Sequence, residues 1–223
     1  MTSRRDWTID HTTGAASEFH GWVPPEPAQR LARWFTVDRP AVVLGSTQSP
    51  DVLDLGACAR MGAEVVRRRS GGGVVLMMPG EIVWLDVVVP AGDPLWNDDV
   101  GEAMWWFGDV WADALRSCGV ADVEVHRGPL ISTPWSRLVC YDGLGAGEVT
   151  VGGAKAVGIS QRRTRAWARL QSSIHLVWNP ALVVELLAEP RPAPGDLRPV
   201  AVVDATAMGA VRAAVDKGVL ALP

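Results

Sequence analysis

The stretch AEVVRRRSGGGVVLMMPGEIVWLDVVVP, residues 63–90, contains the signals that decide the fold. A β-rich run ends in three arginines and a serine, and it leads directly into the glycine triplet Gly71–Gly73. Two further valine-rich runs flank the turn formers Pro79 and Gly80, which predicts a β-hairpin. Strands that succeed one another by short turns are typical of antiparallel or mixed sheets.

The patterns on either side of this stretch predict a single domain. Strands are expected at 40–45, 122–127, 136–141 and 148–151 and within 164–178, and helices at 51–62, 98–118, 179–189 and 204–218. Asp51 and Asn179 are expected to cap two helices, and Gly218 to end the last one. No repeat or clear linker divides the 223 residues. We expect an α+β fold over residues 1–223, with a mixed, largely antiparallel sheet flanked by helices.

The composition argues against several classes of protein. Hydrophobic residues make up 48% of the chain and charged residues 21%, as in an ordinary globular protein. The formal net charge of −4 argues against a dedicated nucleic-acid binder, which needs a broad basic surface. No apolar stretch approaches the ~20 residues that span a bilayer. The start, MTSRRDWTID, lacks the apolar run of a secretory signal. We therefore expect a cytoplasmic protein without a membrane partner.

The cysteines and histidines do not have the spacing of a metal site. Cys58, Cys118 and Cys140 lie far apart and are odd in number, so neither a zinc motif nor a disulfide framework is indicated. The four histidines show no HxH or HExxH spacing, and no structural metal is expected. The eleven tryptophans are expected to fill the core or to line a hydrophobic groove.

The glycine triplet is the first candidate for chemistry. Three successive glycines leave their backbone N–H groups unshielded, so the chain can approach an anion closely. The arginines just before them can add charge-assisted hydrogen bonds to a phosphate or a carboxylate. The alternative is a flexible turn beside a solvated basic edge, and composition alone leaves both open.

Lys155 is the second candidate, because it is one of only two lysines in a chain that otherwise uses arginine. It lies in VTVGGAKAVGIS, residues 149–160, which predicts a hairpin with its corner at Gly152-Gly153. Such a hairpin would present the ammonium beside Gly158 and Arg162, where it could hold a carboxylate or phosphate oxygen. The alternative is an exposed lysine at a hairpin tip.

Together these stretches resemble the catalytic domain of lipoate–protein ligases and their octanoyltransferase relatives. The family's RRxSGGGxV corresponds to Arg67–Val75 here, and its GxKxxGxAxR corresponds downstream to Gly153–Arg162. VVLGSTQSP, residues 42–50, is similar to the family's VVIGRNQNP. The resemblance covers roughly residues 34–178. It implies a fold like the catalytic domain of biotin and lipoate protein ligases.

The resemblance also implies a reaction and a set of site residues. In the ligases, ATP with Mg activates lipoate or octanoate as an acyl-adenylate. The acyl group is then joined to a lysine on the lipoyl domain of a 2-oxoacid dehydrogenase or on the glycine-cleavage carrier protein. Lys155 and Cys140 are the catalytic candidates. The residues expected to bind the acyl chain or the adenylate are Arg68, Ser70, Gly71, Gly72, Gly73, Val74, Val75, Leu76, Gly158 and Arg162.

Cys140 indicates a second branch of the same family. One group of octanoyltransferases has a cysteine fifteen residues before the motif lysine and a glutamate eight residues after that cysteine. Cys140, Glu148 and Lys155 keep this spacing. That branch needs no ATP, because an acyl carrier protein delivers the acyl group as a thioester that passes to the cysteine. An ammonium close to a thiol favours the reactive thiolate. The alternative is a small buried residue on a strand.

Departures from the family pattern motivate a second hypothesis. The family's HDxGN after the glycine loop is replaced by Met77–Glu81, and its later HG is replaced around LQSSIHL, residues 170–176. A non-catalytic protein that binds lipoate or a fatty acyl group is therefore the alternative function. No C-terminal accessory domain is expected after the catalytic domain, which favours transfer or a ligase with a separate partner chain. Biotin transfer is the weaker third possibility, because the glycine motif is of the lipoate type.

Overall fold

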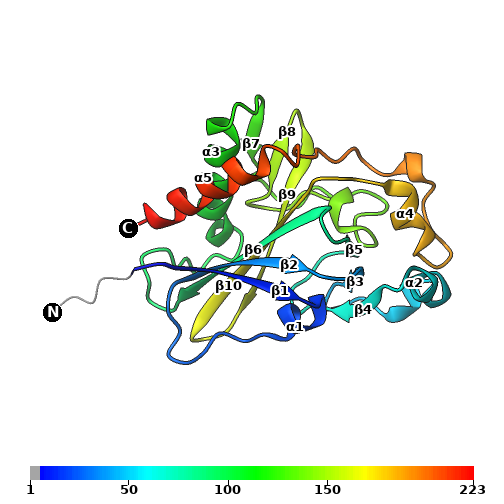
Figure 1. Cartoon of the computed structure of the whole chain (residues 1–223), viewed down its shortest axis with the longest axis horizontal. Helices are drawn as coiled ribbons and strands as arrows, with labels where there is room; N and C mark the ends of the chain where they lie inside the picture. Colours follow the sequence, from blue (N-terminus) through cyan, green and yellow to red (C-terminus); the bar gives the residue numbers. More distant parts are fainter. Residues whose placement is uncertain (1–5) are drawn as a thin grey trace.

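Two β-sheets with helices packed against them make up residues 6–223, the part of the chain that the computed structural model describes (Figure 1). The strands are β1 (Thr8–Gly14), β2 (Leu31–Val37), β3 (Ala41–Leu44), β4 (Glu64–Arg67), β5 (Val75–Met77), β6 (Ile82–Pro90), β7 (Val123–Val125), β8 (Val149–Val151), β9 (Ala154–Arg163) and β10 (Trp167–His175). The α-helices are α1 (Ala16–Gly21), α2 (Leu55–Met61), α3 (Trp105–Ser117), α4 (Pro180–Glu185) and α5 (Met208–Leu220). The 3-10 turns are η1 (Pro50–Val52), η2 (Glu102–Met104), η3 (Cys140–Asp142) and η4 (Pro194–Asp196).

The larger sheet has seven strands in the order β1-β2-β6-β10-β9-β8-β7, and the smaller has the order β4-β3-β5. In the larger sheet only β1 and β2 run parallel, and every other pair is antiparallel. The expected α+β fold with a mixed, largely antiparallel sheet and flanking helices is therefore confirmed. The first five residues, which entered the argument against a secretory signal, lie outside the described part of the chain.

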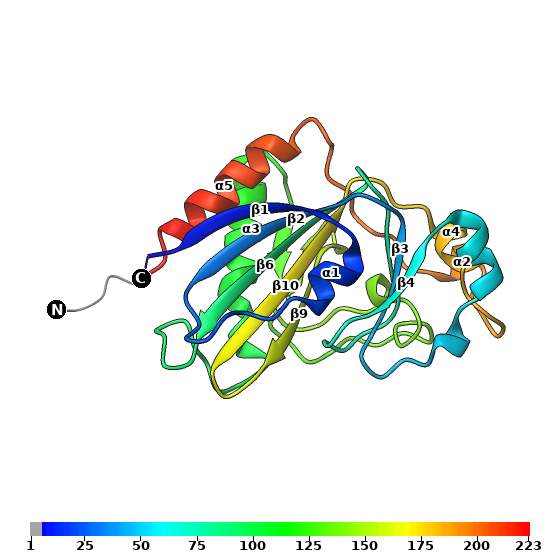
Figure 2. The same cartoon turned by 60° about the horizontal axis from the view of Figure 1, so that its bottom comes forward.

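The core lies on both faces of the larger sheet. Figure 2 shows α3 behind this sheet and α1 in front of it. On one face, Phe107 and Trp111 of α3 and the valines of α5 pack on alternate residues of β2 and β6. On the other face, Phe19 of α1 packs on Phe35 and Trp84. Because both of its faces are covered, β6 is buried along nearly its whole length, which explains its continuous apolar sequence.

The hairpin predicted around Pro79-Gly80, over residues 72–90, is wrong. β5 pairs with β3 in the smaller sheet, whereas β6 is central in the larger sheet between β2 and β10. The nine residues of β6 are matched by the nine of β10, whereas β5 has only three. The turn at Pro79-Gly80 therefore carries the chain from one sheet to the other.

The second hairpin is confirmed. β8 and β9 are antiparallel, and Gly152 and Gly153 form the corner with φ of 56° and 78°. Two successive positive φ values suit the tight turns that match the twist of a hairpin, and glycine adopts them without strain.

Three local predictions need correction. Asp54, not Asp51, caps α2, because residues 50–52 form η1 and Asp54 accepts the hydrogen bond of the Ala57 N–H. The strand expected at 136–141 is replaced by η3 and a single bridge between Val139 and Val74. α5 continues past Gly218, where the absence of a Cβ lets the helix lie close to Val110 of α3.

Asn179 caps α4 as expected, and its side chain accepts a hydrogen bond from the Leu182 N–H. None of the helices in residues 6–223 is long and apolar enough to cross a membrane.

Gly108 tests the packing of α3. A Cβ on this residue would lie 2.2 Å from the Gly147 carbonyl oxygen and 2.9 Å from a methyl of Val125. We expect Gly108→Ala to lower the free energy of unfolding by about 1–3 kcal/mol, because backbone on the other side cannot give way easily. Urea denaturation measures the change. The matched control is Gly209→Ala in α5, where nothing lies within 4 Å of the added Cβ. Equal stability of the two variants would contradict the packing argument.

Candidate active site between the two sheets

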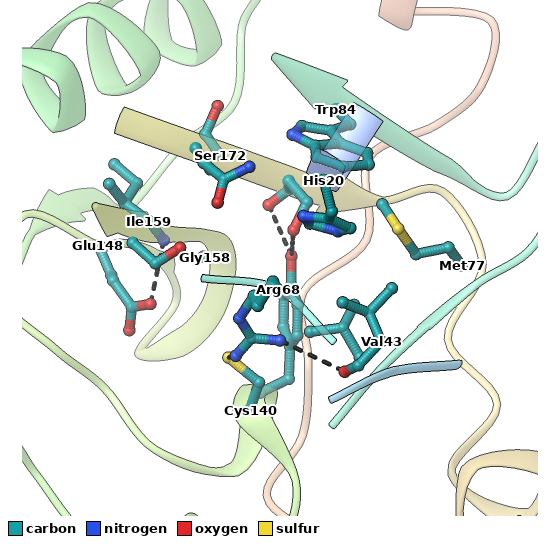
Figure 3. Close-up of a pocket in the computed structure, with 15 residues that line it drawn as sticks. His20, Val43, Arg68, Met77, Trp84, Cys140, Glu148, Gly158, Ile159 and Ser172 are labelled. Atoms are coloured by element: carbon teal, nitrogen blue, oxygen red, sulfur yellow. Dashed lines mark hydrogen bonds between the residues drawn. The ribbon is translucent and has the colours of Figure 1, made fainter. Parts of the chain in front are cut away.

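Two cavities with shared lining residues lie where the sheets meet. A narrow chamber of about 50 Å³ runs between the sheets, and an open groove of about 680 Å³ lies outside it. Cys140, Glu148, Ile159 and Ser160 line both of them. The groove is also lined by the glycine triplet and by Lys155, so the two stretches singled out in the sequence face one space. Figure 3 shows the chamber with Cys140 and Arg68 at one end and His20, Trp84 and Met77 at the other.

Arg68 builds the glycine loop. Its Nη2 donates to the carbonyls of Gly71 and Gly73, both at 2.8 Å, and its Nε donates to Gly71 at 3.1 Å. The Arg68 side chain is buried and cannot bond to bulk water, so these carbonyls accept the hydrogen bonds of its guanidinium. Nη2 also lies 3.7 Å from the Cys140 sulfur. The guanidinium thus shapes the loop and is placed to stabilise negative charge on that sulfur.

The glycines allow the loop to touch the segment that carries Cys140. A Cβ on Gly73 would lie 2.7 Å from the Cys140 nitrogen, and a Cβ on Gly72 would lie 3.3 Å from the Cys140 sulfur. Gly72 also has a φ of 102°, which other residues rarely adopt. Among the hydrogen bonds of residues 6–223, none uses the N–H groups of Gly71–Gly73. These groups are therefore available to an anion or a carbonyl oxygen in the groove.

Cys140 begins η3, and its neighbours fix it at the sheet junction. The Cys140 N–H donates to Val74 O at 3.0 Å, and the Val74 N–H donates to Leu138 O at 2.7 Å. Gln48 adds a second tie, because its Nε2 donates to the carbonyls of Arg137 and Leu138. The turn after β3, the glycine loop and the cysteine segment are thereby held together.

Lys155 is buried, with a side-chain exposure of 5%. Its Nζ lies 2.8 Å from Glu148 Oε1 and donates to the carbonyls of Cys140 at 3.0 Å and Gly143 at 3.1 Å. These three acceptors match the three N–H bonds of an ammonium. The exposed hairpin tip considered above is therefore wrong, and Lys155 instead anchors the turn that carries Cys140.

Glu148 completes this arrangement. Besides Lys155, its carboxylate accepts hydrogen bonds from the Ile159 N–H at 3.0 Å and the Gly145 N–H at 2.7 Å. A buried carboxylate with an ammonium and two backbone donors is well compensated for the loss of water. The spacing of Cys140, Glu148 and Lys155 in the sequence thus corresponds to one bonded cluster.

The other predicted residues divide into three groups. Gly158 and Val75 line the chamber, and Gly158 leaves room for Lys155, whose Cε would be 3.3 Å from an added Cβ. Ser70 is buried and donates to Gln171, while Ser160 donates to Ser70. Val74 and Leu76 pack in the core beside the smaller sheet, facing away from the chamber.

Arg162 does not lie beside Lys155, so that prediction is wrong. The two residues are seven positions apart on the extended strand β9, which separates them by about 23 Å. The Arg162 guanidinium lies over the Trp167 ring at 5.1 Å. Burial, and then the charges of Arg69 and Arg169, lower the pKa of Arg162.

Sequence reasoning missed several residues of the chamber: His20, Val43, Trp84, Tyr141 and Gln171. His20 belongs to α1, in the crossover between the parallel strands β1 and β2, a region for which no element was predicted. The alternation in LARWFTV, residues 31–37, was the available signal for β2 and hence for that crossover.

A buried ion pair supports the chamber from β6 and β10. Arg169 bonds to Asp86, and its other nitrogens donate to the carbonyls of Trp22 and Phe19. Burial is the largest influence on the pKa of Asp86 and raises it, against the opposing effect of Arg169. Gln171 connects this pair to Ser70 of the glycine loop.

No group of three or more histidine, cysteine or acidic side chains in the described residues could hold a metal ion. The three cysteines are all free thiols.

Comparison with known proteins identifies the family. A family model described as the lipoyl protein ligase A/B catalytic domain matches residues 24–217. The chain belongs to this family. Octanoyltransferase LipM of Clostridioides difficile (strain 630) is 24% identical over 132 residues, which cover 59% of this chain and 48% of the relative. The match therefore spans about half the length of that relative.

Solved structures of the lipoyl ligase family share the fold. The putative lipoate protein ligase Ta0514 from T. acidophilum, with bound lipoic acid, superposes with a TM-score of 0.66 at 17% identity. The match covers 96% of this chain and 83% of that one. Lipoate-protein ligase A bound with ATP superposes with a TM-score of 0.68 at 15% identity, over 96% and 83% of the two chains.

The Lys155–Glu148 pair predicts a large effect from one substitution. Glu148→Gln leaves a buried ammonium without its counter-charge, so we expect a loss of about 3–5 kcal/mol in the free energy of unfolding. Glu148→Gln combined with Lys155→Met should recover part of this loss, because no unpaired charge remains. Urea denaturation measures both. As a control, Asp113→Asn in the exposed Asp113–Arg116 pair should change stability by less than about 1 kcal/mol. A small loss in Glu148→Gln would contradict the role given to the pair.

His175 predicts a pH dependence of stability. Burial, and then the charge of Lys155, lower the pKa of His175 from 6.5 to about 4. Below pH 6.5 the unfolded chain therefore binds a proton that the folded chain does not, and stability falls. We expect a contribution of about 2–3 kcal/mol to be lost between pH 7 and pH 4.5. His175→Phe keeps a ring against Tyr141 and Trp178 and removes this contribution.

Urea denaturation of both proteins at the two pH values measures the difference, and the other titrating groups are common to both. Identical pH dependence in wild type and His175→Phe would show that His175 is not held neutral by the fold.

Proposed function

We propose that this member of the lipoyl ligase family is an octanoyltransferase that acts through a thioester on Cys140. The observation that carries the proposal is the position of the Cys140 thiol. Cys140 lines both the narrow apolar chamber and the groove, and it lies beside the unused N–H groups of the glycine triplet. A straight acyl chain in the chamber would place its carbonyl carbon at this junction.

The first step is attack of the Cys140 thiolate on the carbonyl carbon of an octanoyl thioester on an acyl carrier protein. A new C–S bond forms to Cys140, the bond to the carrier sulfur breaks, and the carrier leaves as a thiolate that takes up a proton. The N–H groups of Gly71–Gly73 would donate to the oxyanion of the tetrahedral intermediate, as in other acyl-transfer sites. Arg68 favours the thiolate before attack.

The second step transfers the octanoyl group to the acceptor. A lysine amine attacks the Cys140 thioester, an amide bond forms, and the C–S bond breaks. The proton lost by the amine returns to the Cys140 sulfur, which restores the free thiol. The open groove would supply the space for this lysine. As the family resemblance implies, the acceptor would be the lipoyl domain of a 2-oxoacid dehydrogenase or the glycine-cleavage carrier protein.

In this proposal Lys155 acts mainly by holding the nucleophile. Its ammonium donates to the carbonyl of Cys140 itself, so it fixes the turn on which the thiol stands. A direct contact with the acyl carbonyl, as expected from the family, would require Lys155 to exchange one of its three present acceptors.

ATP-dependent ligation is the second candidate, and the same N–H groups favour it. Three unused backbone donors that line the same groove as a buried ammonium would fit the α-phosphate of a lipoyl- or octanoyl-adenylate as well as they fit an oxyanion. ATP would activate the acyl carboxylate, with Mg as its counter-ion. A relative of the same fold was solved with ATP, which supports this candidate. The relationship to octanoyltransferase LipM, together with the position of Cys140, favours the thioester route. The cytoplasmic location stays a prediction.

Intact mass spectrometry separates these possibilities. The wild-type chain, incubated with an octanoyl acyl carrier protein, should gain one octanoyl group. Cys140→Ser should gain no thioester, because a neutral hydroxyl is a much weaker nucleophile. Cys118→Ser is the matched control, since Cys118 is also a partly exposed free cysteine and should leave the adduct unchanged.

Incubation of the same proteins with octanoate and ATP tests the ligase. An acyl-adenylate formed equally by wild type and Cys140→Ser would replace the thioester route by ligation. Absence of both products from folded protein would leave the non-catalytic binding protein as the function.

A further inference from the structure

The groove outside the chamber carries an unbalanced positive charge. Its charged lining residues are Arg137, Glu148 and Lys155, and the last two neutralise each other in their buried ion pair. Arg137 is exposed, and its guanidinium has no ion pair or hydrogen bond within residues 6–223. The groove therefore presents a cation to a ligand, although the chain as a whole has a formal net charge of −4.

Arg69 is a second exposed arginine whose guanidinium has no partner in the described part of the chain. The neighbouring Ser70 accepts a hydrogen bond at 3.0 Å from Ser160, which lines the groove. Arg162 follows two residues after Ser160 and lies on the same side of β9. Burial is the largest cause of the lowered pKa of Arg162, and the charge of Arg69 is the next. Two guanidinium groups thus lie near one another at this end of the groove.

This pair of cations lacks a counter-charge. The Nη1 atom of Arg162 is buried without a hydrogen-bond partner in residues 6–223. Like charges that lie close together repel, and a bound anion would turn this repulsion into attraction. Guanidinium groups bind phosphate especially well, because their N–H pairs match two of its oxygens. The arginines that form ion pairs with carboxylates in the same part of the chain are others: Arg30, Arg33, Arg39, Arg116, Arg127, Arg169 and Arg191.

Arg69 and Arg137 flank the glycine loop at its two ends. Arg69 lies three residues before Gly72, where an added Cβ would be 3.3 Å from the Cys140 sulfur. Arg137 lies three residues before Cys140 itself. Three residues span at most about 10 Å, so both arginines lie within reach of a ligand bound at the thiol. Arg69 occupies the variable position of RRxSGGGxV, and Arg137 lies outside the motifs.

The donor in the proposed function carries an anion at a matching distance. An acyl carrier protein presents its thioester on a pantetheine arm, which a phosphodiester joins to the protein. From sulfur to phosphorus the extended arm measures about 15 Å, the length of four to five extended residues. With its carbonyl carbon at Cys140, such an arm would run out along the groove. The acceptor instead brings a lysine, so unpaired cations at the groove suit the donor better than the acceptor.

We propose that Arg69 and Arg137 bind the phosphodiester of this arm and thereby select thioesters carried on phosphopantetheine. The inference rests on the proposed function, because it takes an acyl carrier protein as the donor. The two arginines are specificity-determining residues, and they do not touch the reacting atoms. ATP offers the same phosphate chemistry, so the experiment includes it as a separate arm.

Isothermal titration calorimetry on Cys140→Ser tests the inference without acyl transfer to the thiol. The two probes are S-octanoyl-pantetheine and S-octanoyl-pantetheine 4′-phosphate, which differ only in the phosphate. The phosphate should raise the affinity about tenfold, as expected for a charge-assisted hydrogen bond. This ratio should fall to about one when Arg69→Gln and Arg137→Gln are added, and part of it should remain with either one alone. Salt at about 0.5 M should also lower the ratio, because it screens exposed charges.

A matched control and a second ligand make the result specific. Arg60→Gln, at an exposed arginine of α2, should keep the full ratio in the same Cys140→Ser background. A merely structural effect of the groove substitutions would weaken both probes together and leave their ratio unchanged. ATP is titrated into the same proteins. Binding of ATP that needs Arg69 and Arg137, without any gain from the phosphate of the pantetheine probe, would assign the two arginines to a nucleotide.

That last result would overturn the inference. It is also overturned if the two probes bind equally to Cys140→Ser, if neither probe binds, or if the ratio survives in the variant that lacks both arginines. Failure of the proposed function gives a different result, which is the absence of an octanoyl adduct on wild-type Cys140. An adduct together with equal binding of the two probes would keep the transferase and remove the phosphate site.

Discussion

Four segments of the chain meet at the ammonium of Lys155: η3 through the carbonyl of Cys140, the following turn through Gly143, the start of β8 through Glu148, and β9, which carries the lysine itself. Burying the two charges of Lys155 and Glu148 costs desolvation free energy, and only hydrogen-bond partners at close range offset that cost. A displacement of the Lys155 ammonium from these acceptors would therefore destabilise the folded protein. Because one of its acceptors is the carbonyl of Cys140, the position of the thiol is fixed by the same requirement.

A second constraint acts from the smaller sheet. The glycine loop reaches the cysteine segment with no room for a Cβ at Gly73, and Arg68 bonds to the carbonyls on either side of the bend. The carbonyls of Gly71 and Gly73 thus accept hydrogen bonds from the loop's own arginine, while the N–H groups of these groove-lining glycines have no partner within residues 6–223. This polarity is what makes the bend suitable for an anion, whether that anion is an oxyanion or a phosphate.

Local signals in the sequence predicted most single elements but not how they pair. The β8–β9 hairpin was predictable because Gly152-Gly153 forces a tight turn. β5 and β6 also flank a turn, yet they pair in different sheets, because a three-residue strand cannot match a nine-residue one. Partner choice depends on contacts far apart in the chain, which periodicity does not encode. Lys155 and Cys140 could be found because they stand in local sequence motifs. His20 was missed because it reaches the chamber through the crossover between β1 and β2, for which no element was predicted.

The placement of the chamber between two sheets has an evolutionary consequence. The proposed nucleophile and the Lys155–Glu148 pair that holds it belong to η3, β9 and the start of β8, whereas Val43, Val75 and Met77 come from the smaller sheet. Exchanges among apolar residues of β3 and β5 can reshape the space offered to a ligand without disturbing the charged cluster across from them. Relatives that share the charged cluster can therefore differ in the acyl groups they accept through side-chain exchanges on these two strands, provided that the backbone of the glycine loop is kept.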